Sequence, residues 1–522
     1  MEFSNINQME KAVRKARGEM MRLGFALLFI VGILFYTASH SQGIPNSFLL
    51  VVAAMIGGYM AMNIGANDVA NNVGPAVGSR ALTMTGAIII AAVFEAMGAL
   101  VAGGDVVSTI SKGIIDPTKI PSADVFVWLM IAALLAGALW LNLATWIGAP
   151  VSTTHSIVGG VLGAGIAAGG LEIANWGTMG AIAASWVISP VLGGVIAALL
   201  LYFIKRTVTY KEDMVGAARK IVPWLIALMA WAFLTYISLK GFKKIVKLDF
   251  MSASLIGLTG AVIIFALVKP LINRAAGRMQ NNAQAVNGLF TVPLIFAAAL
   301  LSFAHGANDV ANAVGPLAAI NDALLHAGIA KKASIPLWVM VVGAIGISLG
   351  LTLYGPKLIK TVGSEITELN KSRAYCVAMA AAVTVIIASQ LGLPVSSTHI
   401  AVGGIFGVGF LREYLKQSYA SQLHLILDQH EGEERERIEK YLKNFRKAKI
   451  EDMDQMLKRL KKHEDEVILS KEERKRLKKV YREELVKRSS LIKIAAAWVI
   501  TVPASALLAA VLFFTIRGMM MP

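Results

Sequence analysis

The sequence predicts an all-α membrane protein of about 12 transmembrane helices in two inverted repeats, with broken helices, re-entrant hairpins and a cytoplasmic helical insertion. Three observations support this prediction. The composition is strongly apolar, apolar runs long enough to cross a bilayer follow one another, and two polar phrases each occur twice. Repeated polar phrases in a membrane chain are typical of transporters that bind their cargo between two repeats.

The composition places the chain among membrane proteins. Of its 522 residues, 56% are hydrophobic and 16% are charged, whereas soluble domains average about 25% charged residues. The net charge of +17 fits the cytoplasmic loops of a membrane protein better than a nucleic-acid-binding surface, so no nucleic-acid partner is expected. The single cysteine, Cys376, cannot form an intramolecular disulfide.

Eleven apolar runs approach the roughly 20 residues that cross a bilayer core. They cover 23–38, 48–62, 81–102, 125–147, 176–204, 221–239, 255–271, 289–304, 337–354, 375–393 and 492–516. The first run lacks a small-x-small cleavage site, so we interpret it as a membrane helix and not as a signal peptide. Two shorter glycine-rich pieces, 156–169 and 400–410, are expected to be half-helices or re-entrant hairpins.

Lysine and arginine positions orient the chain in the cell membrane. They gather before the first apolar run and in loops 205–220, 274–278 and 357–373. The positive-inside rule assigns these loops, the N-terminus and the insertion to the cytoplasm of a multi-pass protein. Loop 240–247 carries four lysines on the opposite side and is accepted as an exception.

The repeated phrases define the domain organisation. Gly65–Pro75 recurs as Gly306–Pro316, and Pro150–His155 recurs as Pro394–His399. A later match between 185–188 and 497–500 shows that about 68 extra residues interrupt the second repeat only. The predicted divisions are 1–45 (N-terminal segment with an additional helix), 46–220 (first repeat), 221–248 (connecting helix and loop), 249–411 (second repeat), 412–490 (insertion) and 491–522 (last helix). The connecting helix adds one crossing, which inverts the second repeat.

The insertion at 412–490 is the soluble block of the chain. Glu, Lys, Arg and Leu dominate it, and apolar residues recur at helical spacing, first at Ile438, Tyr441, Leu442 and Phe445 and then at Met453, Met456, Leu457 and Leu460. This pattern predicts two or more amphipathic helices, with a solvated spacer favoured over a regulatory or partner-binding arm.

The first repeated phrase is typical of a cation site. Glycine and asparagine let a helix break, and Gly74-Pro75 adds a further stop. A broken membrane helix frees backbone carbonyls, which with amide and carboxylate oxygens suit a small hard cation. The predicted cation ligands are Asp68, Asp309, Asn71 and Asn312. The plainer alternative, in which Asn and Asp only join helices by hydrogen bonds, is disfavoured by two matched intramembrane aspartates.

The second repeated phrase is typical of an anion site. Each copy places a proline and then hydroxyl residues at the start of a glycine-rich helical piece, and a helix N-terminus with added hydroxyl donors binds phosphate. The candidate anion ligands are Ser152, Thr153, Thr154, Ser396, Ser397 and Thr398, with Asn67 and Asn308 from the first phrase. Ordinary N-capping explains one such copy, but the duplication favours binding.

Three further polar residues have two interpretations each. His155 and His399 either carry protons or fix the local turn by a hydrogen bond. Glu95 lies alone in an apolar stretch and has no counterpart in the second repeat. It is either a coupling-ion ligand or a buried structural carboxyl. Nucleotide-binding and hydrolase motifs are absent from the sequence, so we expect no enzyme and no ATP-driven transport.

With both phrases in view, the chain resembles the inorganic phosphate transporter (PiT) family of sodium- or proton-coupled phosphate permeases. The duplicated GANDVAN and PVS[ST]TH phrases carry the resemblance, which extends from about Phe48 to Ile516. It implies an inverted-repeat fold, phosphate as substrate, functional Asp68 and Asp309, and hydroxyl ligands in the second phrase. The first helix and the insertion depart from the family core, so neither takes a role from the resemblance.

These observations together predict a sodium/phosphate symporter. Its partners would be inorganic phosphate, Na⁺ and the lipid bilayer, with no cofactor beyond Na⁺ held at Asp68 and Asp309, and with a homodimer as one possible assembly. Coupling to H⁺, with phosphate or a metal–phosphate complex as cargo, is the alternative for the same aspartates. An anion channel is the candidate from a different class, and a membrane phosphohydrolase ranks third.

Overall fold

The computed structural model describes residues 2–241, 248–326, 328–329, 335–364, 369–415, 426–427, 430–447, 456, 459–460, 470, 473 and 488–521. Within these residues the regular structure is helical, and an isolated bridge pairs Ile115 with Ala174. Loop 240–247 is the predicted exception to the positive-inside rule, and three of its four lysines lie outside the described residues.

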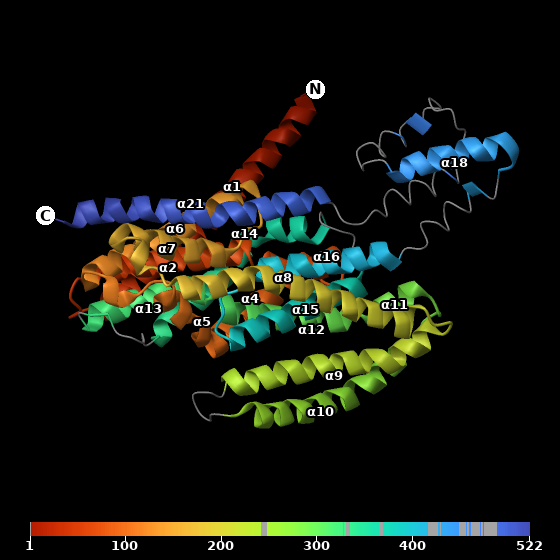
Figure 1. Cartoon of the computed structure of the whole chain (residues 1–522), viewed down its shortest axis with the longest axis horizontal. Helices are drawn as coiled ribbons and strands as arrows, with labels where there is room; N and C mark the ends of the chain where they lie inside the picture. Colours follow the sequence, from red (N-terminus) through yellow and green to blue (C-terminus); the bar gives the residue numbers. More distant parts are fainter. Residues whose placement is uncertain are drawn as a thin grey trace. The chain divides into compact units, whose positions relative to one another are not determined.

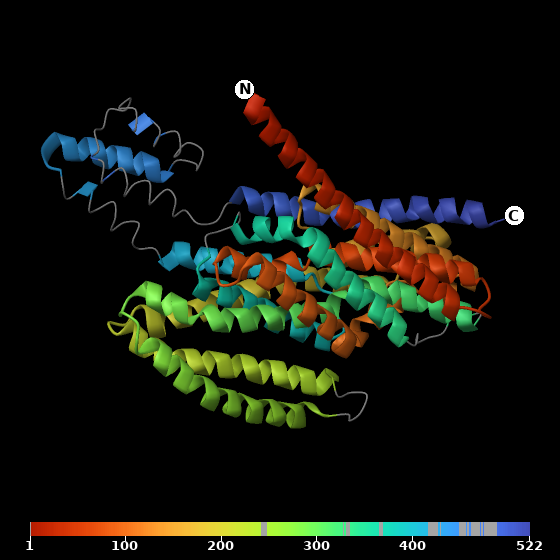
Figure 2. The same cartoon turned by 180° about the vertical axis from the view of Figure 1, so that it is seen from behind.

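Each predicted apolar run lies within a helix or overlaps one (Figures 1 and 2). Among the described residues, eleven helical segments are long and apolar enough to cross a membrane, so the chain is a multi-pass membrane protein. The α-helices are α1 (Glu2–His40), α2 (Ser47–Asn67), α3 (Ala70–Gly78), α4 (Met84–Ala102), α5 (Gly104–Ser108), α6 (Ala123–Ile147), α7 (Thr153–Gly169), α8 (Trp176–Ile204), α9 (Met214–Gly241), α10 (Phe250–Ala276), α11 (Ala283–Leu289), α12 (Thr291–Asp309), α13 (Ala311–His326), α14 (Leu337–Ser364), α15 (Lys371–Gln390), α16 (Ser397–Leu415), α18 (Gly432–Lys447) and α21 (Arg488–Met520).

Each copy of the first repeated phrase interrupts a helix, as the sequence predicts. The α2 helix ends at Asn67 and α3 begins at Ala70. In the second half, α12 ends at Asp309 and α13 begins at Ala311. The two aspartates therefore lie at helix breaks, where backbone groups leave the regular hydrogen-bonding pattern.

The predicted stop at Gly74-Pro75 is wrong. The α3 helix continues through Pro75 to Gly78, and α13 likewise continues through Pro316. A proline removes one backbone donor, but neighbouring groups in a membrane bundle can satisfy the carbonyl that it leaves free. The two prolines thus lie inside short helices that follow the break.

Equivalent helices of the two halves make equivalent contacts with the opposite half. The α2 helix packs against α14, and its counterpart α12 packs against α4. A Cβ at Gly65 would overlap the carbonyl oxygen of Ile347, and a Cβ at Gly306 would overlap that of Glu95. Only glycine lets these backbones approach so closely. These matched contacts are consistent with the predicted inverted repeats.

A second pair of exchanged contacts follows the same pattern. Gly159 on α7 lies against Val502 on α21, and Gly403 on α16 lies against Pro190 on α8. The glycine-rich pieces predicted from the sequence are therefore helices, each held against the last helix of the opposite half. These close backbone contacts position the N-termini of α7 and α16.

The chain forms two compact units, residues 1–407 with 489–522 and residues 408–488. In the second unit, α18 buries Ile438, Leu442 and Phe445, which confirms the first predicted amphipathic stripe. Most of the second stripe lies outside the described residues. All candidate site residues belong to the first unit.

Candidate functional site

The N-termini of α7 and α16 meet at the two helix breaks. Ser152 precedes α7 and accepts a hydrogen bond from the backbone N–H of His155 at 3.1 Å. Ser396 precedes α16 and accepts one from the backbone N–H of His399 at 3.2 Å. These two serines therefore act as N-caps, which leaves the next residues of each helix free to reach the site.

Asp68 receives hydrogen bonds from both of these helices. The Thr153 hydroxyl donates to Asp68 Oδ2 at 2.8 Å. The Ser397 hydroxyl donates to Asp68 Oδ1 at 3.3 Å, and the Thr398 hydroxyl donates to the same oxygen. The four side chains are at most 1% exposed. A carboxylate from the first half is thus bound by residues of both halves.

Asp309 shares one of these donors. Its Oδ2 atom lies 3.0 Å from the Thr153 hydroxyl and 3.2 Å from His305 Nε2. Thr153 therefore bridges the two aspartates. One ligand atom from each of Asp68, Asp309 and His305 can be chosen so that all lie within 4.8 Å of one another, a separation that suits a shared cation.

Asn71 and Asn312 each form hydrogen bonds with the opposite half. The Asn71 amide donates to the Thr398 hydroxyl at 2.7 Å. The Asn312 amide donates to the hydroxyls of Thr153 at 3.0 Å and Thr154 at 3.2 Å. Each asparagine follows the break in one half and contacts the hydroxyl phrase of the other half. The four predicted cation ligands thus form one cluster with Thr153, Thr154, Ser397 and Thr398.

The structure does not bring Asn67 and Asn308 into the hydroxyl cluster. The Asn67 amide donates to the Thr145 hydroxyl at 3.0 Å, and its oxygen accepts from the backbone N–H of Val151 at 3.1 Å. Asn308 donates to the Ser389 hydroxyl at 3.0 Å. In this conformation the two asparagines anchor the helix breaks to neighbouring segments, in matched ways.

Glu95 is linked to the site through a residue that the sequence analysis missed. Its Oε2 atom lies 2.7 Å from His305 Nδ1, and its Oε1 atom accepts from the Asn72 amide at 2.7 Å. His305 in turn contacts Asp309. Glu95, His305 and Asp309 therefore form a fully buried chain of polar side chains.

A sequence signal for His305 existed in the repeat alignment. The step of 241 residues that relates Asn67 to Asn308 pairs His305 with Ile64. An ionisable residue that replaces an apolar one in an otherwise matched membrane segment marks a functional asymmetry. The first half carries the apolar member of the pair.

His155 and His399 form the centre of a ladder of rings. Their ring centroids are 4.4 Å apart. Trp186 lies 3.8 Å from the first ring and Trp498 lies 3.6 Å from the second. Both histidines are buried behind the hydroxyl residues, and their ring nitrogens have no hydrogen-bond partner among the described side chains and backbone. The predicted turn-fixing bond is made by their backbone N–H groups.

Several buried acceptor oxygens around the aspartates have no donor within the described part of the chain. They are Asp309 Oδ1, Asn308 Oδ1, Asn71 Oδ1 and Asn72 Oδ1. Buried acceptors are almost always paired in folded proteins, so such a group marks a place where an ion, a water or a ligand binds. Amide and carboxylate oxygens are the ligands that hard cations prefer.

The charge balance of the cluster also favours cations. Asp68, Asp309 and Glu95 are each 0% exposed, and His305 is the basic side chain that contacts two of these acids. Uncompensated charge in a buried site is costly. The acids therefore require added positive charge, as bound cations or as protons, before an anion can approach.

Comparison with known proteins gives a family match that covers most of the chain. A family model described as "Phosphate transporter family" matches residues 64–509, a range that includes both repeated phrases and every candidate site residue.

Similar proteins have the same kind of name. A protein of Helicobacter pylori strain J99 is 54% identical over 523 residues, covering 98% of each chain. A protein of Pyrococcus abyssi strain GE5 is 38% identical over 365 residues, covering 70% of this chain and 89% of the relative. Both descriptions begin "Putative phosphate permease". A solved structure titled "The sodium-dependent phosphate transporter" is 31% identical, has a TM-score of 0.74, and aligns over 91% of this chain and 100% of its own.

Proposed function

The chain belongs to the phosphate transporter family, whose members are transporters and not enzymes, and from this we propose that it is a symporter that moves inorganic phosphate together with Na⁺. The observation that carries this proposal is the single buried cluster in which Thr153 contacts both Asp68 and Asp309. The similarity to a structure titled as sodium-dependent supports the choice of Na⁺.

The hydroxyl residues at the two helix N-termini would bind the phosphate. Thr153, Ser397 and Thr398 donate to a carboxylate in this structure, and a phosphate oxygen presents the same kind of acceptor. The first turns of α7 and α16 add backbone N–H groups and the positive ends of two helix dipoles. Asn67 and Asn308 remain proposed ligands that would have to leave their present partners.

The acids and amides would hold the cations. Asp68 and Asp309 supply negative charge, and Asn71, whose Oδ1 atom has no donor among the described residues, supplies a neutral ligand. This set of oxygens fits Na⁺, which would supply the positive charge that lets phosphate enter a buried site. Glu95 would act through His305, which it contacts, and not as a direct ligand of an ion at Asp68.

Coupling to H⁺ is the second candidate, and one observation favours it. The buried chain Glu95–His305–Asp309 joins three groups that can each bind a proton. An anion channel would need the two helix N-termini but would not need paired buried acids. The cluster therefore disfavours a channel.

Proteoliposome uptake separates these candidates. Purified protein would be reconstituted, and phosphate uptake would be measured with an inward Na⁺ gradient at equal pH and, separately, with a pH gradient in Na⁺-free buffer. The proposal expects concentrative uptake in the first case only. Uptake that follows the pH gradient without Na⁺ would establish H⁺ coupling, and downhill flux without either gradient would establish a channel.

A further inference from the structure

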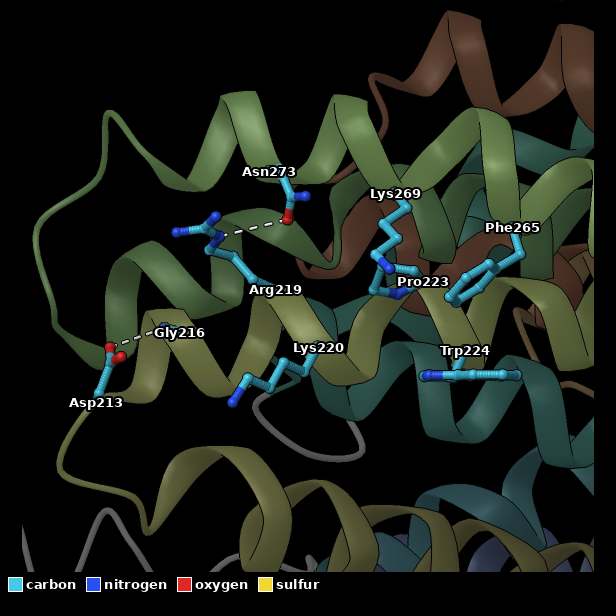
Figure 3. Close-up of a pocket in the computed structure, with 9 residues that line it drawn as sticks. All are labelled: Asp213, Gly216, Arg219, Lys220, Pro223, Trp224, Phe265, Lys269 and Asn273. Atoms are coloured by element: carbon cyan, nitrogen blue, oxygen red, sulfur yellow. Dashed lines mark hydrogen bonds between the residues drawn. The ribbon is translucent and has the colours of Figure 1, made fainter.

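A cavity of about 390 Å³ lies between α9 and α10, outside the central site. The two helices lie side by side in both views of the bundle (Figures 1 and 2). The cavity is lined by the first turns of α9 and the last turns of α10 (Figure 3). Its volume falls within the range of roughly 300–1,000 Å³ that ligand pockets occupy.

The lining combines cations with aromatic rings. Arg219, Lys220 and Lys269 supply three positive charges, and Asp213 supplies one negative charge. The Asp213 carboxylate accepts a hydrogen bond from the backbone N–H of Gly216 at 2.8 Å, so it is occupied as a helix cap. The cavity therefore has an excess of positive charge that is available to an anion.

Two of the three cationic side chains contact a neighbouring residue. The Arg219 Nε atom donates to Asn273 Oδ1 at 3.4 Å, which orients the guanidinium group (Figure 3). The Lys269 ammonium lies 5.4 Å from the centre of the Phe265 ring, a cation–π distance. A planar guanidinium pairs well with phosphate oxygens, and the two ammonium groups add point charges.

The surroundings of the cavity are apolar and face outward. Trp224 packs against Phe265 with ring centroids 4.4 Å apart, yet it is 62% exposed. Leu267 and Leu271 on α10 are 62% and 60% exposed. The α9 helix has 28 residues, so at roughly 1.5 Å per residue it is longer than a bilayer core of about 30 Å. Its first turns would therefore lie at the level of the lipid headgroups.

We propose that this cavity is a second binding site for a phosphate group, separate from the central site. A phosphate group reaches it from one of two sources, the headgroup of an anionic phospholipid or inorganic phosphate in solution. The exposed apolar side chains beside the cavity favour the lipid, because acyl chains would cover them while the cations hold the headgroup. Free phosphate would leave those side chains to other lipids.

The test compares two charge-matched triple variants of the full chain. In the first, Arg219, Lys220 and Lys269 are each changed to Gln. In the control, Lys211, Arg274 and Arg278 are each changed to Gln, which removes the same charge from the last turn of α10 and the adjoining loops and leaves the cavity lining unchanged. Native mass spectrometry would count bound phosphatidylglycerol, with phosphatidylcholine as the zwitterionic reference. Equilibrium dialysis in detergent would count bound inorganic phosphate.

If the source is a lipid, the cavity variant should lose affinity for phosphatidylglycerol by at least about tenfold, since each removed cation near a membrane surface is worth roughly fivefold, while the control variant retains it. If the source is free phosphate, the cavity variant should lose one of two bound phosphates and keep the central one. The proposal is overturned if the cavity variant binds both probes as wild type does. It is equally overturned if the two triple variants lose binding to the same extent.

Discussion

The hydroxyl of Thr153 lies 3.0 Å from Oδ2 of Asp309, although the two residues are 156 positions apart in the chain. Thr153 opens α7 in the first half, and Asp309 ends α12 in the second. Because the same hydroxyl also contacts Asp68, a movement of one half relative to the other must break or remake these bonds. The site is therefore placed where alternating access would act on it.

The shared hydroxyl should matter more than its neighbours. Thr153→Val keeps the shape of the side chain but removes a donor to charged partners, a loss of about 1.5–3 kcal/mol. Phosphate affinity should fall about tenfold or more, as measured by equilibrium binding in detergent, and Thr153→Ser should restore most of it. Unchanged affinity in Thr153→Val would show that this hydroxyl only supports the helix start.

The two aspartates should both be required for ion-dependent uptake. Asp68→Asn and Asp309→Asn keep the size of each side chain but remove the negative charge that a cation needs. Each variant should be folded, by size-exclusion chromatography, and should lose Na⁺-dependent phosphate uptake in proteoliposomes. Wild-type uptake with wild-type Na⁺ dependence in either variant would remove that residue from the cation site.

The contact between Glu95 and His305 should be visible as coupling in stability. Glu95→Ile or His305→Ile alone breaks a buried ionisable pair, which costs about 3–5 kcal/mol. The double variant recreates the apolar pair Ile64 and Ile347 that the other half carries at the equivalent positions. The melting temperature of the double variant in detergent should be higher than that of either single variant. Additive losses in the double variant would show that the two side chains act independently.

Close backbone contact should make Gly306 intolerant of a side chain. A Cβ at this position would overlap the carbonyl oxygen of Glu95, whereas a Cβ at Gly180 on α8 meets no atom within 4 Å. Gly306→Ala should therefore reduce the yield of folded protein and its melting temperature, and Gly180→Ala should not. Equal melting temperatures for the two variants would mean that α4 and α12 lie farther apart.

The sequence predicted much of the fold because apolar runs and repeated phrases act locally. The runs mark the spanning helices, and Gly65 and Gly306 with their following Asn-Asp pairs mark the breaks. The stop at Pro75 was wrong because a proline's effect depends on which neighbours satisfy the freed carbonyl, and neighbours belong to the tertiary structure.

The sequence predicted most residues of the site but not which of them contact one another. The duplication pointed to Asp68, Asp309 and the threonines. It did not show that the N-termini of α7 and α16 each contact residues of the opposite half. His305 was missed because it lies between the apolar run 289–304 and the repeated phrase that starts at Gly306, and its role depends on Glu95, 210 residues away. The cavity between α9 and α10 depends on the packing of two helices that share no motif.

The central claim is that phosphate and Na⁺ bind one shared cluster, and equilibrium binding of phosphate at varied Na⁺ tests it most directly. Phosphate affinity would be measured in detergent at constant ionic strength, with K⁺ replacing Na⁺, for the wild type and Asp309→Asn. The account predicts that Na⁺ raises phosphate affinity in the wild type, that phosphate raises Na⁺ affinity by the same factor, and that Asp309→Asn loses both effects. Phosphate affinity that is the same in Na⁺ and K⁺ would contradict it.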